Sequence, residues 1–175
     1  FGTPFYEKGA YYNTAVKFPI SSSSQSVYKK TKIMPFGEYW PFRQIFRLLN
    51  LKNLVPGADY TPGIKRTMLT ANAAKIGMAI CLESIYPQHF IQAIEKGANL
   101  LVTIANNAWF YDSSASAKLL QMTTLRAVEQ RRTVIQCANT GYSAIISANG
   151  TVLKKIPANT KGFIESSVSL YSQRT

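Results

Sequence analysis

Short apolar runs alternate with a helix-forming stretch in the middle of the chain, and this alternation constrains the fold more than any other feature. Residues 76–81 and 99–104 are short, apolar and bounded, as expected for buried strands. Between them, Pro87 begins a helical stretch that continues to about Lys96, and Gly97 follows as its stop. Because a strand, a helix and a second strand in succession form a parallel pair with the helix on one face, we predict a sheet covered by helices.

Hairpins are predicted on both sides of this unit. Near the N-terminus, residues 11–18 and 27–32 are expected as strands joined by a polar tip at residues 21–26. Later, a helix over residues 114–132 precedes four predicted strands at 133–138, 142–147, 151–156 and 162–167. Asn149-Gly150 is a strong hairpin-turn signal between the middle pair. The pattern predicts a mixed sheet in the α/β or α+β class.

An aromatic loop and a short amphipathic helix lie between the predicted N-terminal hairpin and the strand at residues 76–81. Residues 35–41 read PFGEYWP, a composition typical of a loop that presents side chains. The next apolar residues recur at helical spacing with Arg43 and Arg47 between them; they are Phe42, Ile45, Phe46, Leu48 and Leu49. The predicted helix either packs on the core or lies at a membrane surface with its arginines at headgroup level.

Charge points to an anionic partner. The 175 residues include 20 basic and 8 acidic side chains, a formal net charge of +12, and 46% are hydrophobic, enough for one domain with its own core. The basic residues are scattered and form no nucleic-acid-binding motif, so a membrane-facing surface is favoured over nucleic acid. No apolar run approaches the roughly 20 residues of a spanning helix. Two cysteines and one histidine are too few for a zinc site built from these residue types alone.

Cys81 is the first candidate for a nucleophile. It ends a predicted strand, where open α/β sheets place their ligands, and a nearby cation such as Lys29 or Lys30 would lower its pKa. Without any family comparison, a small buried apolar role or a disulfide to Cys137 remains an alternative. Cys137 itself is expected as a buried residue in the middle of a strand.

The remaining titratable candidates are few. His89 is expected as a partly exposed residue in the first turn of a helix, so a Cys-His dyad has little support. Glu38 in the aromatic loop and Glu83, two residues after Cys81, lie near the expected site. Glu129 has Arg126 and Arg132 three residues to either side, a spacing that favours a structural ion pair.

Five ordered motifs resemble the nitrilase superfamily, in the form found in apolipoprotein N-acyltransferases. Residues 28–41 (YKKTKIMPFGEYWP) are similar to its lysine motif, and residues 77–83 (GMAICLE) to its nucleophile strand. The loop at 106–110 (NNAWF), the helix at 126–129 (RAVE) and the strand at 139–144 (NTGYSA) follow in the family's order and spacing. The resemblance implies a nitrilase-like αββα sandwich and extends from about residues 12–13 to the end of the chain.

The same resemblance implies roles for individual residues. Cys81 would be the thiolate nucleophile, Lys30 the cation that holds the tetrahedral oxyanion, and Glu38 a glutamate that orients the lysine and the substrate. The backbone N–H after Cys81 would complete the oxyanion hole, in which one donor contributes roughly 3 kcal/mol. Alternation along a strand points Lys29 and Lys30 to opposite faces, so only one of them reaches the site. Supporting or acyl-pocket positions are expected at Tyr39, Leu82, Glu83, Asn106 and Trp109.

One member of the family's Glu-Lys-Cys triad, the general-base glutamate, is expected well upstream of the lysine. The only acidic residue before Lys30 is Glu7, which is too close in sequence to be that base. We therefore expect residues 1–175 to be the C-terminal portion of a carbon-nitrogen hydrolase domain, incomplete at its N-terminal side and inactive as given. The membrane-spanning regions that flank such domains are expected outside it.

The leading functional hypothesis is an acyltransferase. A fatty acyl group would move from a phospholipid to the N-terminal diacylglyceryl-cysteine amine of apolipoproteins through a Cys81 thioester, with no cofactor and no metal. The expected location is the periplasmic face of the bacterial inner membrane. Two alternatives remain: a soluble carbon-nitrogen hydrolase that cleaves a small amide with the same residues, and an inactive domain that binds anionic lipid surfaces.

Overall fold

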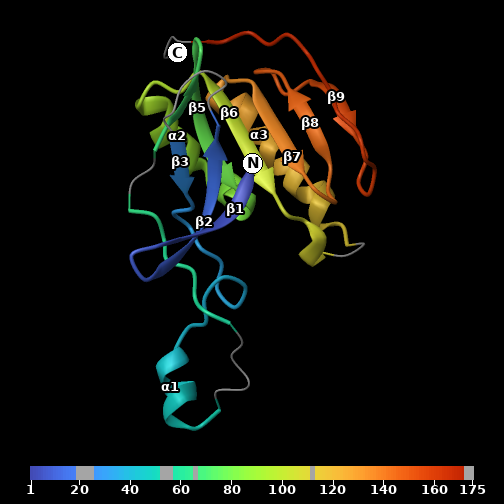
Figure 1. Cartoon of the computed structure of the whole chain (residues 1–175). Helices are drawn as coiled ribbons and strands as arrows, with labels where there is room; N and C mark the ends of the chain where they lie inside the picture. The colour runs from blue at the N-terminus through green and yellow to red at the C-terminus, as the bar shows by residue number, and fades with distance from the viewer. Residues whose placement is uncertain (19–25, 52–56, 65–66, 111–112, 172–175) are drawn as a thin grey trace.

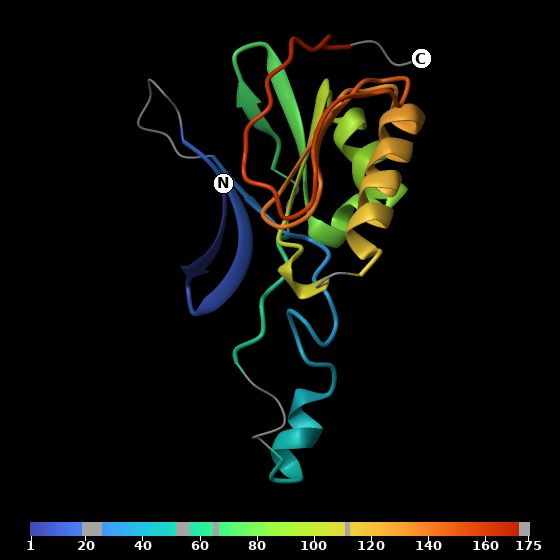
Figure 2. The same cartoon turned by 90° about the vertical axis from the view of Figure 1, so that its right-hand side faces the viewer.

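Two β-sheets pack face to face, and two helices cover the far side of the larger sheet (Figures 1 and 2). The computed structural model describes residues 1–18, 26–51, 57–64, 67–110 and 113–171. The smaller sheet has the order β1-β2-β3, with β1 at Gly2–Glu7, β2 at Ala10–Lys17 and β3 at Ser26–Lys29. Its strands are all antiparallel. The predicted tip at residues 21–26 lies outside the described residues except for Ser26, which belongs to β3.

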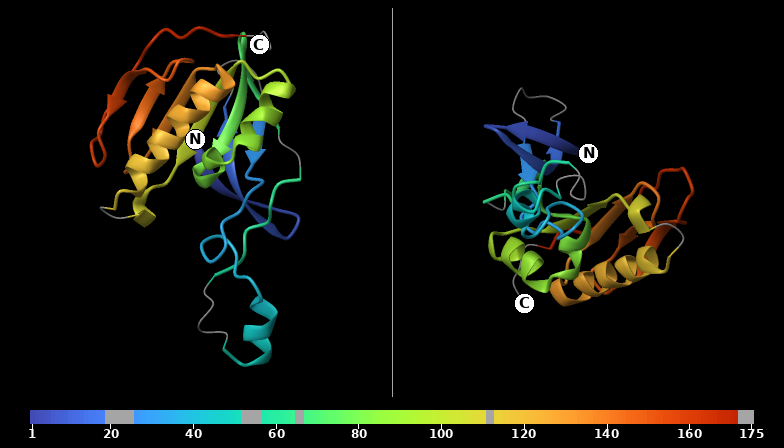
Figure 3. Two further views of the ribbon diagram at one scale, coloured as in Figure 1. Left: turned by 180° about the vertical axis from the view of Figure 1, so that it is seen from behind. Right: turned by 90° about the horizontal axis from the view of Figure 1, so that it is seen from below.

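The larger sheet is mixed, as predicted, and has the order β4-β5-β6-β7-β8-β9. Its strands are β4 (Leu69–Ala71), β5 (Ala74–Ile80), β6 (Leu100–Ala105), β7 (Val134–Ala138), β8 (Ser143–Ile146) and β9 (Val152–Ile156). β5, β6 and β7 are parallel and the other neighbours are antiparallel. Helices α2 (Pro87–Glu95) and α3 (Ala115–Gln130) make the parallel connections and lie on one face of the sheet (Figure 3).

Apolar residues fill both interfaces of this three-layer arrangement. Between the large sheet and its helices, the buried cluster consists of Ala79, Phe90, Ala98, Leu101, Ala127, Val134, Ala144 and Ile146. Between the two sheets it consists of Ala15, Tyr28, Leu69, Met78 and Ile80. Alternation along β5 therefore supplies both cores, since successive side chains point to opposite faces. These layers are three of the four in the predicted αββα sandwich, and among the described residues no helix covers the outer face of the small sheet.

Most predicted elements are confirmed, and the exceptions lie at the edges of the two sheets. Strand β1 was not predicted because it contains Pro4, which an edge strand tolerates, and β4 has only three residues. The strand predicted at 162–167 is wrong. That segment forms no ladder with β9 or with any other described strand. Its apolar alternation reflects the half-burial of Ile164 and Val168.

The expected ion pair on α3 is present in part. The Arg126 guanidinium donates to the Glu129 carboxylate at 2.9 Å and to the carbonyl of Ile85 at 3.2 Å. The Arg132 guanidinium instead donates to backbone carbonyls, those of Ala98 and Arg131 among them. Arg126 therefore ties α3 to the chain segment that follows Cys81.

The amphipathic helix is observed as α1 (Arg43–Leu48), and it does not pack on the core. It lies at the end of an arm that extends away from the two sheets (Figures 1 and 2). The Arg43 guanidinium makes two hydrogen bonds of 2.7 Å to the Asp59 carboxylate, which joins the two limbs of this arm. Of the two sequence interpretations, only the one that leaves the helix outside the core agrees with the structure.

Gly77 permits the close approach of α2 to β5. A Cβ atom at this position would lie 2.8 Å from the Ala93 Cβ and 2.9 Å from the Leu101 Cδ2. We therefore expect Gly77→Ala to destabilise the protein by about 1–3 kcal/mol through overpacking, measured as a loss in the free energy of unfolding. Gly162→Ala is the matched control, because its Cβ would meet only the Ile156 Cδ1 at 3.7 Å. Equal stabilities for the two variants would contradict this account of the packing.

Candidate active site

Cys81 lies at the turn where β5 ends. It begins the 3-10 helix η2 (Cys81–Ile85) with φ of +53°, in the left-handed region that side chains other than glycine seldom occupy. The Ser84 hydroxyl donates to the Cys81 carbonyl at 2.9 Å and helps to close this turn. Strained positions of this kind cluster at functional sites, and here the turn places the thiol at the carboxyl end of a parallel strand.

Lys30 reaches the same place from the smaller sheet. Its backbone amide continues the pairing with β2 by donating to the Asn13 carbonyl at 2.8 Å, and its side chain is only 2% exposed. The ammonium group donates to Glu38 Oε2 at 2.7 Å. The neighbouring Lys29 points the other way and pairs with Glu7 Oε2 at 2.5 Å, as strand alternation predicts.

Glu38 is fixed by three donors from two parts of the chain. Besides Lys30, the Met34 amide donates to Oε2 at 2.7 Å and the Asn13 side chain donates to Oε1 at 2.6 Å. The Met34 carbonyl in turn accepts from the Glu38 amide at 2.8 Å, so the loop is a closed turn. The carboxylate thereby fixes the Lys30 ammonium in one direction.

These groups line one open pocket of about 550 Å³. Its polar side contains Asn13, Lys30, Glu38, Asn106 and Asn139, and its apolar side contains Met34, Ile80, Ile104, Ala105, Trp109 and Ala138. Both thiols, Cys81 and Cys137, also line it. The structure thus brings together five of the sequence-predicted residues, namely Cys81, Lys30, Glu38, Asn106 and Trp109.

Three predicted residues do not line the pocket. Tyr39 is half-buried in the aromatic loop, where its carbonyl accepts from the Phe36 amide. Leu82 contributes its backbone N–H, whose interaction with the Cys81 thiol lowers the pKa of that thiol. Glu83 is fully buried behind the pocket and accepts hydrogen bonds from Tyr28, Thr31, Lys32 and Ile80.

Two expectations about single residues were wrong. Cys137 is exposed, not buried, because the wall of the pocket that it forms has no covering layer. His89 is 2% exposed, not partly exposed, because α2 docks on β5 and turns the ring inward. The alternative disulfide is not formed, since both thiols are free. β6 lies between the two strands, a separation of about two strand spacings of 4.8 Å, which is too wide for a disulfide.

Burial dominates the electrostatics of the nucleophile. It raises the pKa of the Cys81 thiol above its ordinary value, while the Lys30 charge and the Leu82 N–H lower that pKa in part. The carboxylates of Glu38 and Glu83 raise it further. The resting site therefore favours the protonated thiol, and a reaction through sulfur requires a base that removes this proton.

The arrangement offers some of the groups that acyl chemistry needs. A carbonyl carbon placed at the Cys81 sulfur would have its oxygen near an ammonium group and a backbone N–H, the donors that stabilise a tetrahedral oxyanion. Among the described residues, no group of three or more His, Cys, Asp or Glu side chains could hold a metal ion. The three-layer fold agrees with the nitrilase-like arrangement that the resemblance implies, and its pocket holds a thiol and an ammonium group.

Comparison with known proteins identifies the family. Residues 1–174 match the carbon-nitrogen hydrolase family, and the chain belongs to it. It is 34% identical over 176 residues to an apolipoprotein N-acyltransferase of Geobacter metallireducens. This alignment covers 97% of this chain and 33% of that protein. A protein of the same name from Bdellovibrio bacteriovorus is 35% identical over 142 residues, or 79% of this chain and 26% of that protein. The chain thus spans between about a quarter and a third of the length of these curated relatives.

Solved structures confirm the nitrilase-like fold. The Nit3 protein of Saccharomyces cerevisiae, a member of the nitrilase superfamily, superposes with a TM-score of 0.69 at 15% identity, covering 91% of this chain and 55% of that one. A carbon-nitrogen hydrolase from Helicobacter pylori gives a TM-score of 0.65 at 18% identity, covering 89% and 56%.

Sequence reasoning missed the residues that hold the site together. Asn13 was noted only as the start of the resemblance, yet it donates to Glu38. Asn139 lies in a recognised motif, but nothing local indicated that its side chain donates to Asn106 at 2.7 Å across two loops. The available signal was an asparagine in each of two predicted strand-end loops, which gives the residue type but not the contact between the two side chains.

The Lys30 charge should be measurable through the reactivity of Cys81. Lys30→Met removes a positive charge that lowers the Cys81 pKa, so the pH midpoint of Cys81 alkylation by iodoacetamide should rise. Lys29→Met is the matched control and should leave the midpoint unchanged, since Lys29 faces Glu7. The measurement is peptide-resolved mass spectrometry over a pH series. A midpoint that does not respond to Lys30→Met would show that the two groups do not share a site.

Proposed function

We propose that this chain carries the nucleophile and the oxyanion-binding groups of an apolipoprotein N-acyltransferase. The observation that carries the proposal is the convergence of Cys81 and Lys30 on one pocket, in a chain whose curated relatives bear that name. The acyl donor is a phospholipid, and the acceptor is the N-terminal diacylglyceryl-cysteine amine of an apolipoprotein. The relatives give no support to the amidase or the inactive lipid-binding alternative.

The first half-reaction forms a thioester. The Cys81 sulfur, its proton removed by a base, attacks the ester carbonyl of the phospholipid and forms a carbon-sulfur bond. Negative charge develops on the carbonyl oxygen, where the Lys30 ammonium and the Leu82 N–H stabilise it. The ester carbon-oxygen bond then breaks, and the lysophospholipid leaves with the proton that the thiol gave up.

The second half-reaction transfers the acyl group to nitrogen. The acceptor amine attacks the thioester carbonyl, a carbon-nitrogen bond forms and the carbon-sulfur bond breaks. The amine loses one proton to the base, and the Cys81 sulfur regains one. The thioester thus divides one difficult exchange between ester and amine into two easier steps.

The base is assigned to a glutamate outside these residues. Glu38 already accepts from Lys30, Asn13 and Met34, and so it is suited to hold the lysine rather than to shuttle a proton. We propose that residues 1–175 form the C-terminal portion of a carbon-nitrogen hydrolase domain, whose preceding part supplies the base. The experiments below therefore use the full-length protein that contains this chain.

An acyl group on Cys81 is the direct test of this function. After incubation of the full-length protein with phospholipid, mass spectrometry should find one fatty acyl group on the peptide that contains Cys81. Cys81→Ala should abolish the adduct and acyl transfer. Cys137→Ala tests the other thiol of the pocket and should still form the adduct. An adduct that survives in Cys81→Ala would end the proposal.

The arm supports a membrane partner for this chemistry. Its apolar side chains are exposed to an unusual degree, with Phe42 at 74%, Leu48 at 86% and Leu49 at 60%. They lie around α1, far from the layers of the fold (Figure 1). Exposed apolar patches of this kind mark interaction sites, and the formal net charge of +12 favours an anionic lipid surface. We propose that the arm inserts into the phospholipid layer that supplies the acyl donor.

We propose accordingly that the domain acts at the periplasmic face of the bacterial inner membrane, where donor and lipoprotein acceptor would meet. Within the described ranges, no helix has the length and apolarity needed to cross a bilayer.

Insertion of the arm predicts an effect on the donor alone. Leu48→Glu should raise the KM for phospholipid about tenfold with little change in kcat, because burial of a leucine side chain contributes roughly 1.5–3 kcal/mol. Gln44→Glu places the same charge at an exposed polar position of the same helix and should change KM little. Steady-state transfer at varied phospholipid fraction measures both. Similar KM values in the two variants would refute the insertion.

A further inference from the structure

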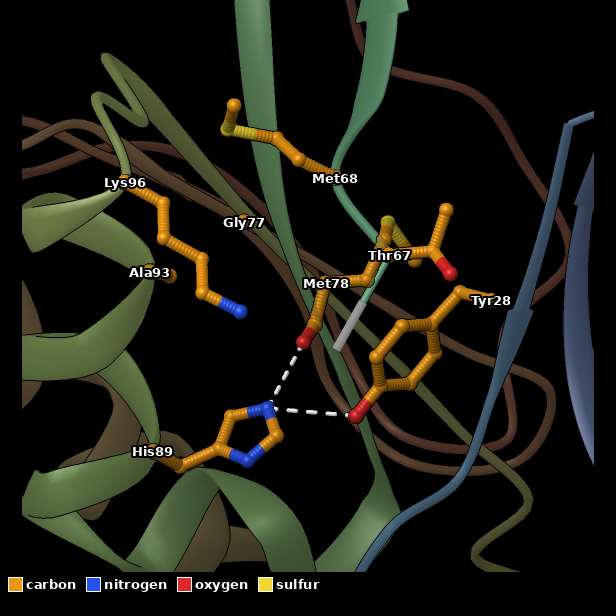
Figure 4. Close-up of a pocket in the computed structure, with 8 residues that line it drawn as sticks. All are labelled: Tyr28, Thr67, Met68, Gly77, Met78, His89, Ala93 and Lys96. Carbon is orange, nitrogen blue, oxygen red and sulfur yellow. Dashed lines mark hydrogen bonds between the residues drawn. The ribbon is translucent and has the colours of Figure 1, made fainter. Parts of the chain in front are cut away.

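A second group of polar side chains lies behind the pocket, enclosed between β3, β5 and α2. It consists of Tyr28, Glu83 and His89, whose exposed fractions are 1%, 0% and 2%. Figure 4 shows the His89 ring pointing from α2 toward the Met78 carbonyl and the Tyr28 hydroxyl. None of these three residues lines the catalytic pocket, and the proposed reaction leaves His89 without a role.

The chemistry of the partners fixes the direction of the hydrogen bonds. His89 Nε2 lies 2.8 Å from the Met78 carbonyl oxygen, which can only accept, so Nε2 carries a hydrogen. The Tyr28 hydroxyl lies 3.3 Å from the same nitrogen and donates its own hydrogen to Glu83 Oε2 at 2.8 Å. The hydroxyl oxygen therefore accepts a share of the same Nε2 hydrogen, in a bifurcated bond whose shorter branch goes to the Met78 carbonyl. The bonds lead from His89 through Tyr28 to Glu83.

The other ring nitrogen agrees with this assignment. His89 Nδ1 is buried, makes no hydrogen bond to any described residue, and lies 3.9 Å from Glu83 Oε1. The space beside the ring is only about 10 Å³, and its walls include Met68, Met78, Ala93 and Lys96 (Figure 4). The ring is thus confined, and its contribution is one donated hydrogen at Nε2.

Glu83 connects this group to both reactive side chains. Its Oε1 accepts from the Thr31 amide at 2.8 Å, the Thr31 hydroxyl at 2.9 Å and the Lys32 amide at 3.0 Å, directly after Lys30. Its Oε2 accepts from the Ile80 amide at 2.9 Å, directly before Cys81. The Glu83 carboxylate therefore links the backbone that follows Lys30 to the backbone that precedes Cys81.

We propose that His89 is a positioning residue of the site. By donating to Tyr28, it fixes the hydroxyl that orients the Glu83 carboxylate, and Glu83 sets the distance between Lys30 and Cys81. The catalytic meaning of this inference rests on the proposed function, but the positioning itself does not. His89 touches no substrate and acts only through Tyr28 and Glu83.

The test reads the effect of Lys30 on Cys81 without any acyl substrate. In the full-length protein, His89→Leu removes the donor and should raise the pH midpoint of Cys81 alkylation by iodoacetamide by about 0.5–1 unit. His89→Gln keeps an N–H near the Nε2 position, so its midpoint should lie close to that of the native protein. Tyr28→Phe removes only the hydroxyl and should shift the midpoint in the same direction as His89→Leu. Gln88→Leu, an exposed position on the same helix, is the matched control.

Cys137 serves as an internal reference, because it is a second thiol of the same molecule and lies on β7, away from α2. A general loosening of the fold would change the alkylation of both thiols, whereas the proposal predicts a change at Cys81 alone. If His89→Leu does not fold, Tyr28→Phe decides the question. An unchanged Cys81 midpoint in Tyr28→Phe, or equal shifts at both thiols, would overturn the proposal. Native protein that shows the shift series but never acylates Cys81 would refute the proposed function and leave the positioning role intact.

Discussion

The site depends on one buried carboxylate that joins two sheets. Lys30 follows a strand of the small sheet and Cys81 follows a strand of the large one. Neither sheet alone can therefore fix the position of one side chain relative to the other. Glu83 accepts from backbone amides on each side, at Thr31, Lys32 and Ile80. Charge-assisted hydrogen bonds of this kind are stronger than neutral ones and are costly to break when buried. The same Glu83 hydrogen bonds therefore fix both the packing of the two sheets and the geometry of the site.

The electrostatics of the pocket explain why several groups are needed. Burial raises the Cys81 pKa and so favours the protonated thiol. The positive charge of Lys30 lowers this pKa only in part, and the Glu38 carboxylate raises it again. A site that relied on a permanent thiolate would need a more positive environment. In the proposed reaction, Lys30 would act when negative charge moves from sulfur to the carbonyl oxygen, because its ammonium is already fixed by Glu38 at 2.7 Å. Removal of the Cys81 proton is a separate requirement, which a base must meet.

Local patterns predicted the elements with strong periodicity and failed where tertiary contacts decide. Strand β5 and helices α2 and α3 follow from apolar spacing and terminal residues, within one or two residues of their ends. The pairing of β1, the burial of His89 and the exposure of Cys137 depend on what other segments cover, which no local window contains. In the same way, the motifs indicated Cys81, Lys30 and Glu38, whereas Asn13 and Tyr28 become interpretable only once the two sheets are packed.

The most direct measurement is a structure of the full-length protein trapped as its acyl-enzyme with a slowly transferred phospholipid analogue. The account predicts a thioester on Cys81 whose carbonyl oxygen lies within hydrogen-bond distance, about 2.7–3.2 Å, of both the Lys30 ammonium and the Leu82 N–H. An acyl carbonyl on Cys81 that points away from Lys30, or an acyl group held by another residue, would contradict it.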